Sequence, residues 1–577
     1  MKLQIIRRDL NHLSAEGLPG LHPVLARVYA ARGVCCLAEV DYALAGLHPF
    51  GALSGIDAAV DLLIDSLHRG HRMLVIGDFD ADGATSCATA LRVLRHLGVA
   101  EVAYLVPNRF EYGYGLTPAI VEVAARRGAD LLITVDNGMT SLEGVAHAQR
   151  LGMRVLVTDH HLPGSQLPGA DAIVNPNGPG DGFPSKHLAG VGVIFYVLIA
   201  LRARLREAGW FAKWRIAEPN LAQVLDLVAL GTVADVVPLD RNNRILVAQG
   251  LERIRSGRCQ PGVRALLQVA GRDPQQATTA DLAFGAAPRL NAAGRLQDMS
   301  LGIECLLADE PGRALEMAHR LDRLNRDRRR IEDGMLEEAL ALLEQLSFER
   351  AEEQVPCGLC LFDQRWHQGV IGILAARIKE RFHRPVVAFA ADGSDEVKGS
   401  ARSIAGLHIR DVIDAVAVRE PGLISRFGGH AMAAGLTLKR SDVERFAAAF
   451  EAEVQHRLSA DHLQPILYSD GPLMAEEFDL ALAESIQRAG PWGPGFTEPV
   501  FDGRFKVLQQ RIVGERHLKL TLEVPGTERR VGAIAFNAEV PWQACSSHVD
   551  IAYKLAVNHY QGSRSVQLIV EHLQLPC

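Results

Sequence analysis

Short apolar runs alternate with helical patterns over residues 73–175, and this alternation is the clearest regularity in the chain. Each run has the length of a buried strand and is followed by residues with the spacing of an amphipathic helix. This order is typical of βαβ units, which build a parallel sheet with helices on its faces. We therefore expect functional side chains at the carboxyl ends of the strands. The expected strands are MLVIG (73–77), VAYLV (102–106), LLITV (131–135), RVLVT (154–158) and DAIVN (171–175).

The pattern becomes mainly helical over residues 186–257. Its apolar run from 188 to 201 has 14 residues, which is too short for a membrane span and indicates a buried helix. Residues 311–350 contain few helix breakers and repeat Leu and Met at helical spacing, which predicts a long connecting helix.

A second α/β pattern opens at LCLF (359–362) and continues through PVVAFA (385–390), VKGSARS (397–403) and the glycine-rich RFGGHAMAAG (426–435). After residue 459 the chain changes to short alternating strands separated by Gly, Pro and Asn turns. A small β-barrel is the favoured interpretation of this last part, and a β-sandwich is the alternative.

These patterns predict an α/β protein with several domains, in keeping with 577 residues at roughly 150 residues per domain. A parallel-sheet domain is joined by a long helix to a smaller α/β domain, and a β-barrel follows. The expected parts are an N-terminal segment packed on the first domain (1–60), the parallel-sheet domain (61–310), the connecting helix (311–355), the second α/β domain (356–458) and the barrel (459–577).

Composition narrows the class of protein further. Hydrophobic residues make up 48% and charged residues 22%, as in ordinary globular proteins. The net charge of −7 gives no general attraction to nucleic acid, so a polyanion must be held by local clusters. Nine scattered cysteines make no disulfide framework, and the pair Cys357 and Cys360 lacks further zinc ligands nearby. No secretory signal is visible, so we expect a cytoplasmic protein without a membrane partner.

Three carboxylates follow the first strand within the motif GDFDADG (77–83) and precede a helix. Asp78, Asp80 and Asp82 would repel one another unless a cation compensates them. A metal site resolves the repulsion, although an acidic loop in water is the simpler alternative. An EF-hand is excluded because its Gly and Glu spacing is absent and a strand precedes the motif.

Further acids and imidazoles occur at the ends of later elements. Asp136 ends the strand LLITV, and Asp159, His160 and His161 end RVLVT. Asp235 is the only charge in the apolar helix end GTVADVVPL (231–239), where it needs a partner such as a metal ion, or a backbone bond at the helix end. Carboxylates with one imidazole suit Mn²⁺ or Mg²⁺ better than a thiolate-binding metal.

Several loops carry groups that could bind a phosphate chain. Arginine forms bidentate bonds with phosphate, a tyrosine ring stacks on bases, and bare backbone amides bind anions. A solvated loop with a packed aromatic ring is the alternative for the first of these loops. The candidate substrate-binding residues are Arg109 and Tyr114, then Arg289 and Asn291 in PRLNAAGR (288–295), then Ser400, Arg402, Gly428, Gly429 and His430, together with His161.

The motifs DFDADG, Asp136, DHH (159–161) and GTVADVVPL, in this order, resemble the four motifs of the DHH phosphoesterases. GGHAMAAG (428–435) resembles the glycine-histidine signature of the DHHA1 domain. The combined set is similar to the single-stranded-DNA-specific exonucleases of this family over essentially the whole chain. In that resemblance the terminal barrel corresponds to an oligonucleotide-binding (OB) fold.

The resemblance implies a catalytic centre with two Mn²⁺ or Mg²⁺ ions. Its implied ligands are Asp80, Asp82, a bridging Asp136, His160 and Asp235, with Asp78 as a further ligand. Ile76 stands where other DHH enzymes carry a histidine ligand, so the set around the first ion departs from theirs. His161 is then available to the substrate phosphate, and Asp159 could orient a neighbouring ring.

The implied activity is 5′→3′ exonuclease cleavage of single-stranded DNA to mononucleotides by activated water, in DNA repair and recombination. A helicase and a single-strand-binding protein are the implied partners. Two other hypotheses stay open. One is a hydrolase of short oligonucleotides, cyclic dinucleotides or pyrophosphate, and the other is a catalytically silent DNA-binding scaffold.

Overall fold

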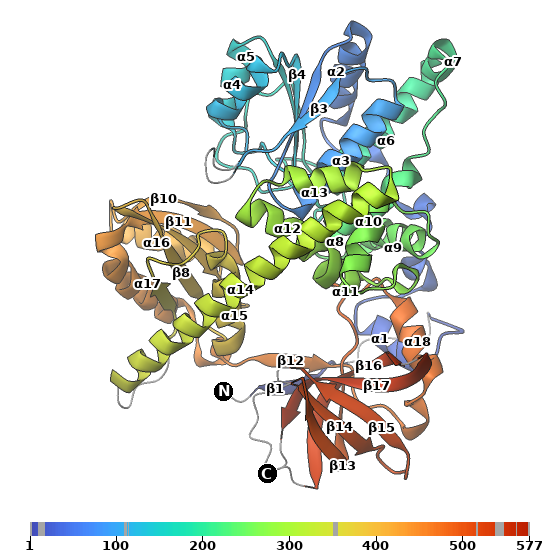
Figure 1. The fold of residues 1–577 in the computed structure, drawn as a ribbon, viewed down its shortest axis with the longest axis vertical. Helices are drawn as coiled ribbons and strands as arrows, with labels where there is room; N and C mark the ends of the chain where they lie inside the picture. The colour runs from blue at the N-terminus through green and yellow to red at the C-terminus, as the bar shows by residue number, and fades with distance from the viewer. Residues whose placement is uncertain are drawn as a thin grey trace. The chain divides into compact units, whose positions relative to one another are not determined.

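The computed structural model describes residues 3–9, 18–108, 112, 115–349, 356–514, 517–536, 547–560 and 562–574 (Figure 1). The chain divides into two units, one of Met1–Ile6 with Leu324–Leu467 and one of Arg7–Arg323 with Tyr468–Cys577. Among the described residues, no helix combines the length and apolar character that crossing a bilayer requires.

The larger unit contains the predicted parallel sheet, in the order β3-β2-β4-β5-β6. Every residue of β2 and β4 is buried, because these central strands are covered on both faces. The carboxyl ends of all the strands therefore meet at one edge. The strands are β2 (Met73–Gly77), β3 (Val102–Leu105), β4 (Leu131–Val135), β5 (Arg154–Thr158) and β6 (Ala172–Val174).

Helices cover both faces of this sheet (Figure 1). α4 (Pro118–Arg126) and α5 (Leu142–Arg150) enclose one apolar core with β2, β4 and β5. α3 packs against β2, α6 and α8, and the expected buried helix is confirmed as α6. The other helices are α1 (Pro23–Ala30), α2 (Ile56–Arg69), α3 (Ala81–His96), α6 (Gly190–Glu207), α7 (Trp210–Trp214), α8 (Leu225–Ala234), α9 (Arg241–Arg255), α10 (Pro261–Val269), α11 (Thr279–Asp281), α12 (Ala287–Leu296) and α13 (Ser300–Leu307).

The C-terminal part of the larger unit is a closed barrel in the order β13-β14-β15-β17-β16, so the sandwich alternative is wrong. Side chains alternate between the buried interior and the surface along β14, with Leu518, Leu520 and Leu522 inside. The strands are β13 (Phe501–Val513), β14 (His517–Glu523), β15 (Arg530–Ala535), β16 (His548–Tyr560) and β17 (Ser563–Gln574), preceded by α18 (Leu480–Ala489).

The segment before the barrel is bonded to the sheet-bearing part of the same unit. The amide of Leu239 donates to the carbonyl of Pro494 at 2.7 Å. The Arg244 guanidinium lies over the Phe496 ring, 4.1 Å from its centroid, which is a cation–π contact. Barrel and parallel sheet therefore share one unit.

The smaller unit has a sheet in the order β10-β11-β9-β8-β7, in which only β7 and β8 pair in parallel among the described strands. Within this unit, buried Glu332 of α14 accepts hydrogen bonds from Arg328 and from Arg377 of α15. The elements are β7 (Leu359–Phe362), α15 (Ile371–Phe382), β8 (Val386–Asp392), β9 (Glu396–Arg402), α16 (Ile409–Arg419), β10 (Ile424–Gly429), β11 (Ala433–Lys439) and α17 (Val443–Arg457).

The predicted long helix is α14 (Pro311–Glu349), whose residues from Leu324 onward belong to the smaller unit. One further short pairing joins β1 (Gln4–Arg7) to β12 (Ile466–Ser469).

Candidate metal centre

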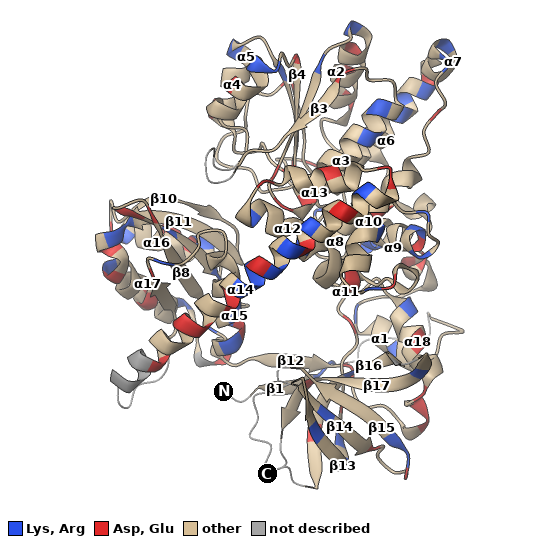
Figure 2. Ribbon diagram, viewed as in Figure 1, with Lys and Arg blue, Asp and Glu red and all other residues tan. Residues whose placement is uncertain are grey.

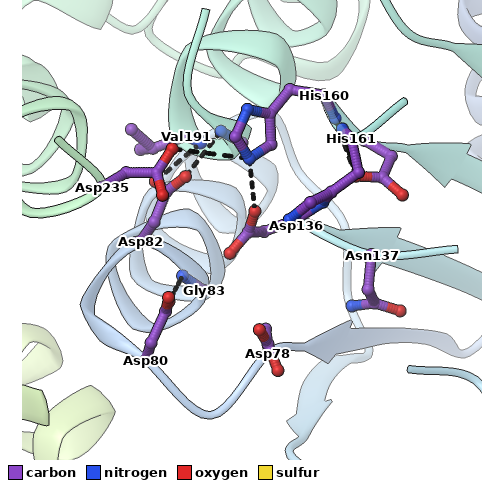
Figure 3. A network of polar contacts seen from close by, with 12 residues as sticks. Asp78, Asp80, Asp82, Gly83, Asp136, Asn137, His160, His161, Val191 and Asp235 are labelled. Carbon is purple, nitrogen blue, oxygen red and sulfur yellow. Dashed lines mark hydrogen bonds and ion pairs between the residues drawn. The ribbon is translucent and has the colours of Figure 1, made fainter. Parts of the chain in front are cut away.

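The turn between β2 and α3, together with the first turn of α3, presents the first three carboxylates (Figure 3). Asp80 is the N-cap of α3 and accepts a hydrogen bond from the Gly83 amide at 3.0 Å. Asp78 accepts from the Phe79 amide at 2.7 Å. A Cβ at Gly83 would lie 2.5 Å from the Asp78 carbonyl oxygen, so only glycine permits this turn.

Asp82 is held by the start of α6. Its two oxygens accept from the Gly190 amide at 2.6 Å and from the Val191 amide at 3.0 Å. A helix N-terminus favours a carboxylate because its first amides are unpaired and its dipole is positive. A Cβ at Gly190 would lie 2.5 Å from the Asp136 Cβ, so this glycine lets α6 approach two acids at once. Gly190 was not among the predicted site residues, and its only signal in the sequence is the small-residue start of the apolar run at 188.

Asp136 ends β4 in the left-handed region, with φ of 62°, and is 2% exposed. The next residue, Asn137, secures this bend. Its Nδ2 donates to the carbonyls of Ile76, at 3.1 Å, and Val135, at 2.9 Å, and so joins the ends of β2 and β4. Backbone strain of this kind persists where the surroundings fix it, which is typical of functional sites.

The end of β5 places two imidazoles and one buried acid. Asp159 accepts from the His160 amide at 2.8 Å and from Nδ1 of His161 at 2.7 Å. Nε2 of His160 lies 3.1 Å from Asp136 and 3.5 Å from Asp235, the residue that caps the C-terminus of α8. Asp159 therefore orients His161, as the sequence analysis suggested for a neighbouring ring.

The six side chains predicted to bind metal converge at this edge of the sheet (Figure 3). Their ligand atoms form two sets, each with all members within 4.8 Å of one another, Asp78–Asp80–Asp136 and Asp82–His160–Asp235. A third set of the same compactness, Asp136–His160–His161, overlaps both. The structure thus offers two neighbouring groups of ligands, with Asp136 next to both.

Burial makes this concentration of charge costly. Burial, and then the charge of Asp80, raises the pKa of Asp82 to about 7. Burial and the surrounding carboxylates also raise the pKa values of Asp136 and Asp235 well above the usual range for aspartate. Divalent cations would remove this cost by compensating the charges, and the oxygen-rich donor set suits Mg²⁺ or Mn²⁺. The residues therefore fit two such ions.

His161 and Asp159 form a charged pair beside these groups. Burial opposes the charge of both side chains and is the largest single effect, but the hydrogen bond between them together with the surrounding charges outweighs it. The pKa of His161 is consequently raised and that of Asp159 is lowered. A protonated imidazole held in one orientation can donate to an anionic ligand.

Two of the other predicted residues, Arg109 and Tyr114, lie outside the described residues. Asn291 does not reach outward, because its Oδ1 accepts from the Ala81 amide at 2.8 Å and so holds the acidic turn. Arg289 is 8% exposed and is bonded within the protein, to the Gly285 carbonyl at 2.6 Å and to Asp322 at 2.7 Å. Both residues are thus part of the scaffold, and their contact with substrate stays a prediction.

The remaining predicted residues lie in the smaller unit. Nη1 of Arg402 donates to Oγ of Ser400 at 3.1 Å. A Cβ at Gly372, in the first turn of α15, would lie 2.8 Å from Nη2 of Arg402, so glycine makes room for this pair.

Gly428 and Gly429 pair with β11 as part of strand β10. The expectation of bare amides is wrong at His430, whose N–H donates to the Ala433 carbonyl at 2.8 Å across a tight turn.

The raised pKa values predict that the metal-free protein loses stability as pH rises. The folded state holds a proton on Asp82 up to about pH 7, whereas an unfolded aspartate releases it near 3.8. The contribution of the Asp82 proton to the free energy of unfolding is therefore complete below about pH 4. It is lost between about pH 4 and 7, which lowers the free energy of unfolding by a few kcal/mol. We expect the melting temperature of the metal-free protein to fall from pH 5 to pH 8, and Mn²⁺ to stabilise most at pH 8. Asp82→Asn should flatten the slope. Equal stabilisation by Mn²⁺ at both pH values would contradict this.

Comparison with known proteins agrees with this geometry. Residues 72–232 match the DHH family N-terminal domain, 355–456 match the DHHA1 domain and 469–572 match the RecJ OB domain. The chain is 55% identical over 560 residues to the single-stranded-DNA-specific exonuclease RecJ of Dickeya dadantii, covering 97% of this chain and 96% of that protein. It is 51% identical over 574 residues to the protein of the same name from Escherichia coli, covering 99% of each.

A crystal structure of RecJ from Thermus thermophilus in complex with Mn²⁺ is similar over the whole of this chain and 80% of that one, with a TM-score of 0.80 and 29% identity. The same protein has been solved with Mg²⁺, at a TM-score of 0.75 and 27% identity. The identity to the Dickeya dadantii and Escherichia coli proteins extends over nearly their full lengths and includes all three matched domains. The chain therefore belongs to the RecJ family of DHH proteins.

Proposed function

We propose that this protein is a metal-dependent exonuclease that degrades single-stranded DNA from the 5′ end to mononucleotides. The observation that carries the proposal is the convergence of five aspartates and His160 at one edge of the parallel sheet, in two neighbouring ligand groups. The names of its relatives, and the Mn²⁺ and Mg²⁺ in related RecJ structures, support the same substrate and cofactor.

Two divalent ions would be held by the two ligand groups, one by Asp78, Asp80 and Asp136 and the other by Asp82, His160 and Asp235. When bound, such ions lower the pKa of an attacking water and neutralise charge on the phosphate oxygens. The chain itself supplies rigidity, because Asp80 and Asp82 are each fixed by backbone amides. Fixed ligands keep the reacting groups in one geometry, which lowers the entropic cost of reaching the transition state.

His161 supplies a positive donor on the same edge. Because its pKa is raised by Asp159, the ring keeps its proton at neutral pH more readily than an ordinary histidine. With Nδ1 bonded to Asp159, a contact to a phosphate oxygen would be made through Nε2. Such a charge-assisted hydrogen bond strengthens as negative charge develops during displacement at phosphorus.

The candidate site for a terminal phosphate is the Arg402 cluster of the smaller unit, defined as Gly372, Ser400 and Arg402. Partial burial lowers the pKa of Arg402, and no carboxylate among the described residues forms an ion pair with it. A half-buried cation beside a hydroxyl and the start of a helix is suited to a phosphate group. We propose that this cluster binds the 5′-terminal phosphate.

The barrel supplies local positive charge that the chain as a whole lacks. Arg511 of β13 and Lys519 of β14 lie directly opposite each other on the surface. Two residues from Lys519 along β14, the ring of His517 lies 5.1 Å from that of Phe536. Cations beside aromatic rings are typical of surfaces that bind single-stranded nucleic acid. Residues 320–330 of α14 also carry more basic than acidic side chains, with six arginines and two aspartates (Figure 2).

We propose further that the enzyme acts in the cytoplasm in DNA repair and recombination, together with a helicase and a single-strand-binding protein. These partners follow from the family resemblance and from the need of such an enzyme for unpaired DNA.

Replacing the shared ligand tests the activity directly. With Mn²⁺ present, we expect the wild type to release mononucleotides from 5′-labelled single-stranded DNA. Asp136→Ala should reduce the rate of release by more than roughly 100-fold, which is the loss expected when a residue that only supports a metal ligand is replaced. Asp61→Ala, which removes an exposed acid of α2, serves as the control and should retain full activity. Full activity of Asp136→Ala would contradict the proposal. A wild type that retains manganese but cleaves no phosphodiester would support the scaffold hypothesis.

A double substitution in the barrel separates the exonuclease from a hydrolase of short substrates. Arg511→Gln with Lys519→Gln should raise the KM for long single-stranded DNA several-fold and reduce its dependence on salt, because fewer phosphates are contacted. Turnover of a dinucleotide should not change. Arg504→Gln is the matched control, since Arg504 lies on the same strand but is paired with Asp550 at 2.7 Å. Equal effects on both substrates would favour the short-substrate hydrolase.

A further inference from the structure

Phe284 is an exposed aromatic residue displayed by an unusual backbone. Its side chain is 72% exposed, whereas Leu282, Gly285 and Ala286 around it are buried. Single exposed apolar side chains are common on proteins and need no explanation by themselves. Here, however, residues Leu282–Ala286 form a π-helical turn, a rare conformation that occurs frequently at functional sites.

Arg289 stabilises this turn from inside the protein. Its Nη1 donates to the Gly285 carbonyl at 2.6 Å, and its Nη2 pairs with Asp322 of α14 at 2.7 Å. Both side chains of this ion pair are less than one-tenth exposed. A buried ion pair of this kind is costly to break, so the display of Phe284 is fixed by the fold.

The turn lies between the barrel and the metal centre along one continuous helical segment. At one end of this segment, Oγ1 of Thr279 donates to the Trp492 carbonyl in the segment that leads into the barrel, at 2.7 Å. At the other end, Asn291 accepts from the Ala81 amide in the acidic turn at 2.8 Å. The two anchors are separated by about 18 Å at the rise of a helix, and Phe284 lies between them. A single DNA strand that runs from the barrel to the metal centre along this segment would pass Phe284.

Arginine side chains lie near the start of this segment. Arg272 lies 3.4 Å from Asp281, the residue that precedes the π-helical turn. Arg255 of α9 donates through Nε to the Ala277 carbonyl at 2.8 Å and interacts electrostatically with Glu252, Arg488 and Asp281. Two guanidinium groups thus lie near the start of the turn, and that of Arg272 is exposed enough to contact a phosphate backbone as well.

We propose that Phe284 is a base-stacking residue on the path of single-stranded DNA from the barrel to the metal centre. A phenyl ring stacks on any base, so the contact adds affinity without sequence preference, as an exonuclease requires. It holds the strand in register while the terminal nucleotide is removed. This inference rests on the proposed function, because it assumes that single-stranded DNA is the substrate.

Steady-state kinetics on long single-stranded DNA provide the first test. Phe284→Ala should raise KM about tenfold with little change in kcat, as expected for loss of one base–aromatic contact. Phe284→Trp should keep the wild-type KM, whereas Phe284→Leu, which is apolar but cannot stack, should behave like Phe284→Ala. Trp214→Ala is the matched control, because Trp214 is 54% exposed and ends α7, far from α11 in the same unit (Figure 1).

A scan with abasic DNA separates base stacking by Phe284 from a merely structural role, because a structural role would not make KM depend on the position of the missing base. Oligonucleotides that lack one base at successive positions from the 5′ end are compared in wild type and Phe284→Ala. We expect one position at which the missing base raises the wild-type KM about tenfold but has no further effect in the variant. Additive effects at every position would overturn the proposal.

An unchanged KM in Phe284→Ala would also overturn it and would leave the exposed ring as a surface for a protein partner. A wild type that does not cleave single-stranded DNA at all would instead refute the proposed function. The melting temperatures of the variants, compared with wild type, show whether the turn is still folded.

Discussion

Mutual repulsion of buried carboxylates at one edge of the parallel sheet is the constraint on which the rest of this structure depends. Burial and like charges raise the pKa values of Asp82, Asp136 and Asp235 together. Such an arrangement opposes folding unless cations or fixed dipoles compensate it. The fold meets this demand by bringing backbone amides to the acids and by leaving no room for other side chains.

The compensation is local and geometric. The starts of α3 and α6 bind Asp80 and Asp82 through their first amides, where the helix dipole is positive. Glycines allow the close approach, since a Cβ at Gly294 of α12 would lie 1.7 Å from the Phe79 carbonyl oxygen. The same contacts that make the acids tolerable therefore also fix their positions for binding ions. Stability and the ligand geometry are two results of one set of hydrogen bonds.

Local pattern sufficed to predict the parallel sheet, the acids at its edge and the closed barrel, because strand periodicity and strand-end position are properties of short segments. Strand β13 has a weaker pattern than its neighbours, since residues 508–512 are all exposed and do not alternate between apolar and polar. The amides of Gly190 and Val191 on Asp82 join residues more than 100 positions apart, and no local pattern contains that contact. The direction of a side chain is equally invisible in a sequence. Arg289 and Asn291 are predicted substrate ligands, and only the fold shows that one also forms a buried ion pair and the other accepts from the Ala81 amide.

Calorimetric titration of the metal-free protein with Mn²⁺ at pH 8 tests the central claim most directly, because it counts ions without requiring catalysis. The convergence of two ligand groups predicts two ions per chain, and predicts that Asp136→Asn weakens the binding of both, since Asp136 lies next to each group. Binding of no ion, or of two ions with unchanged affinity in Asp136→Asn, would contradict the account.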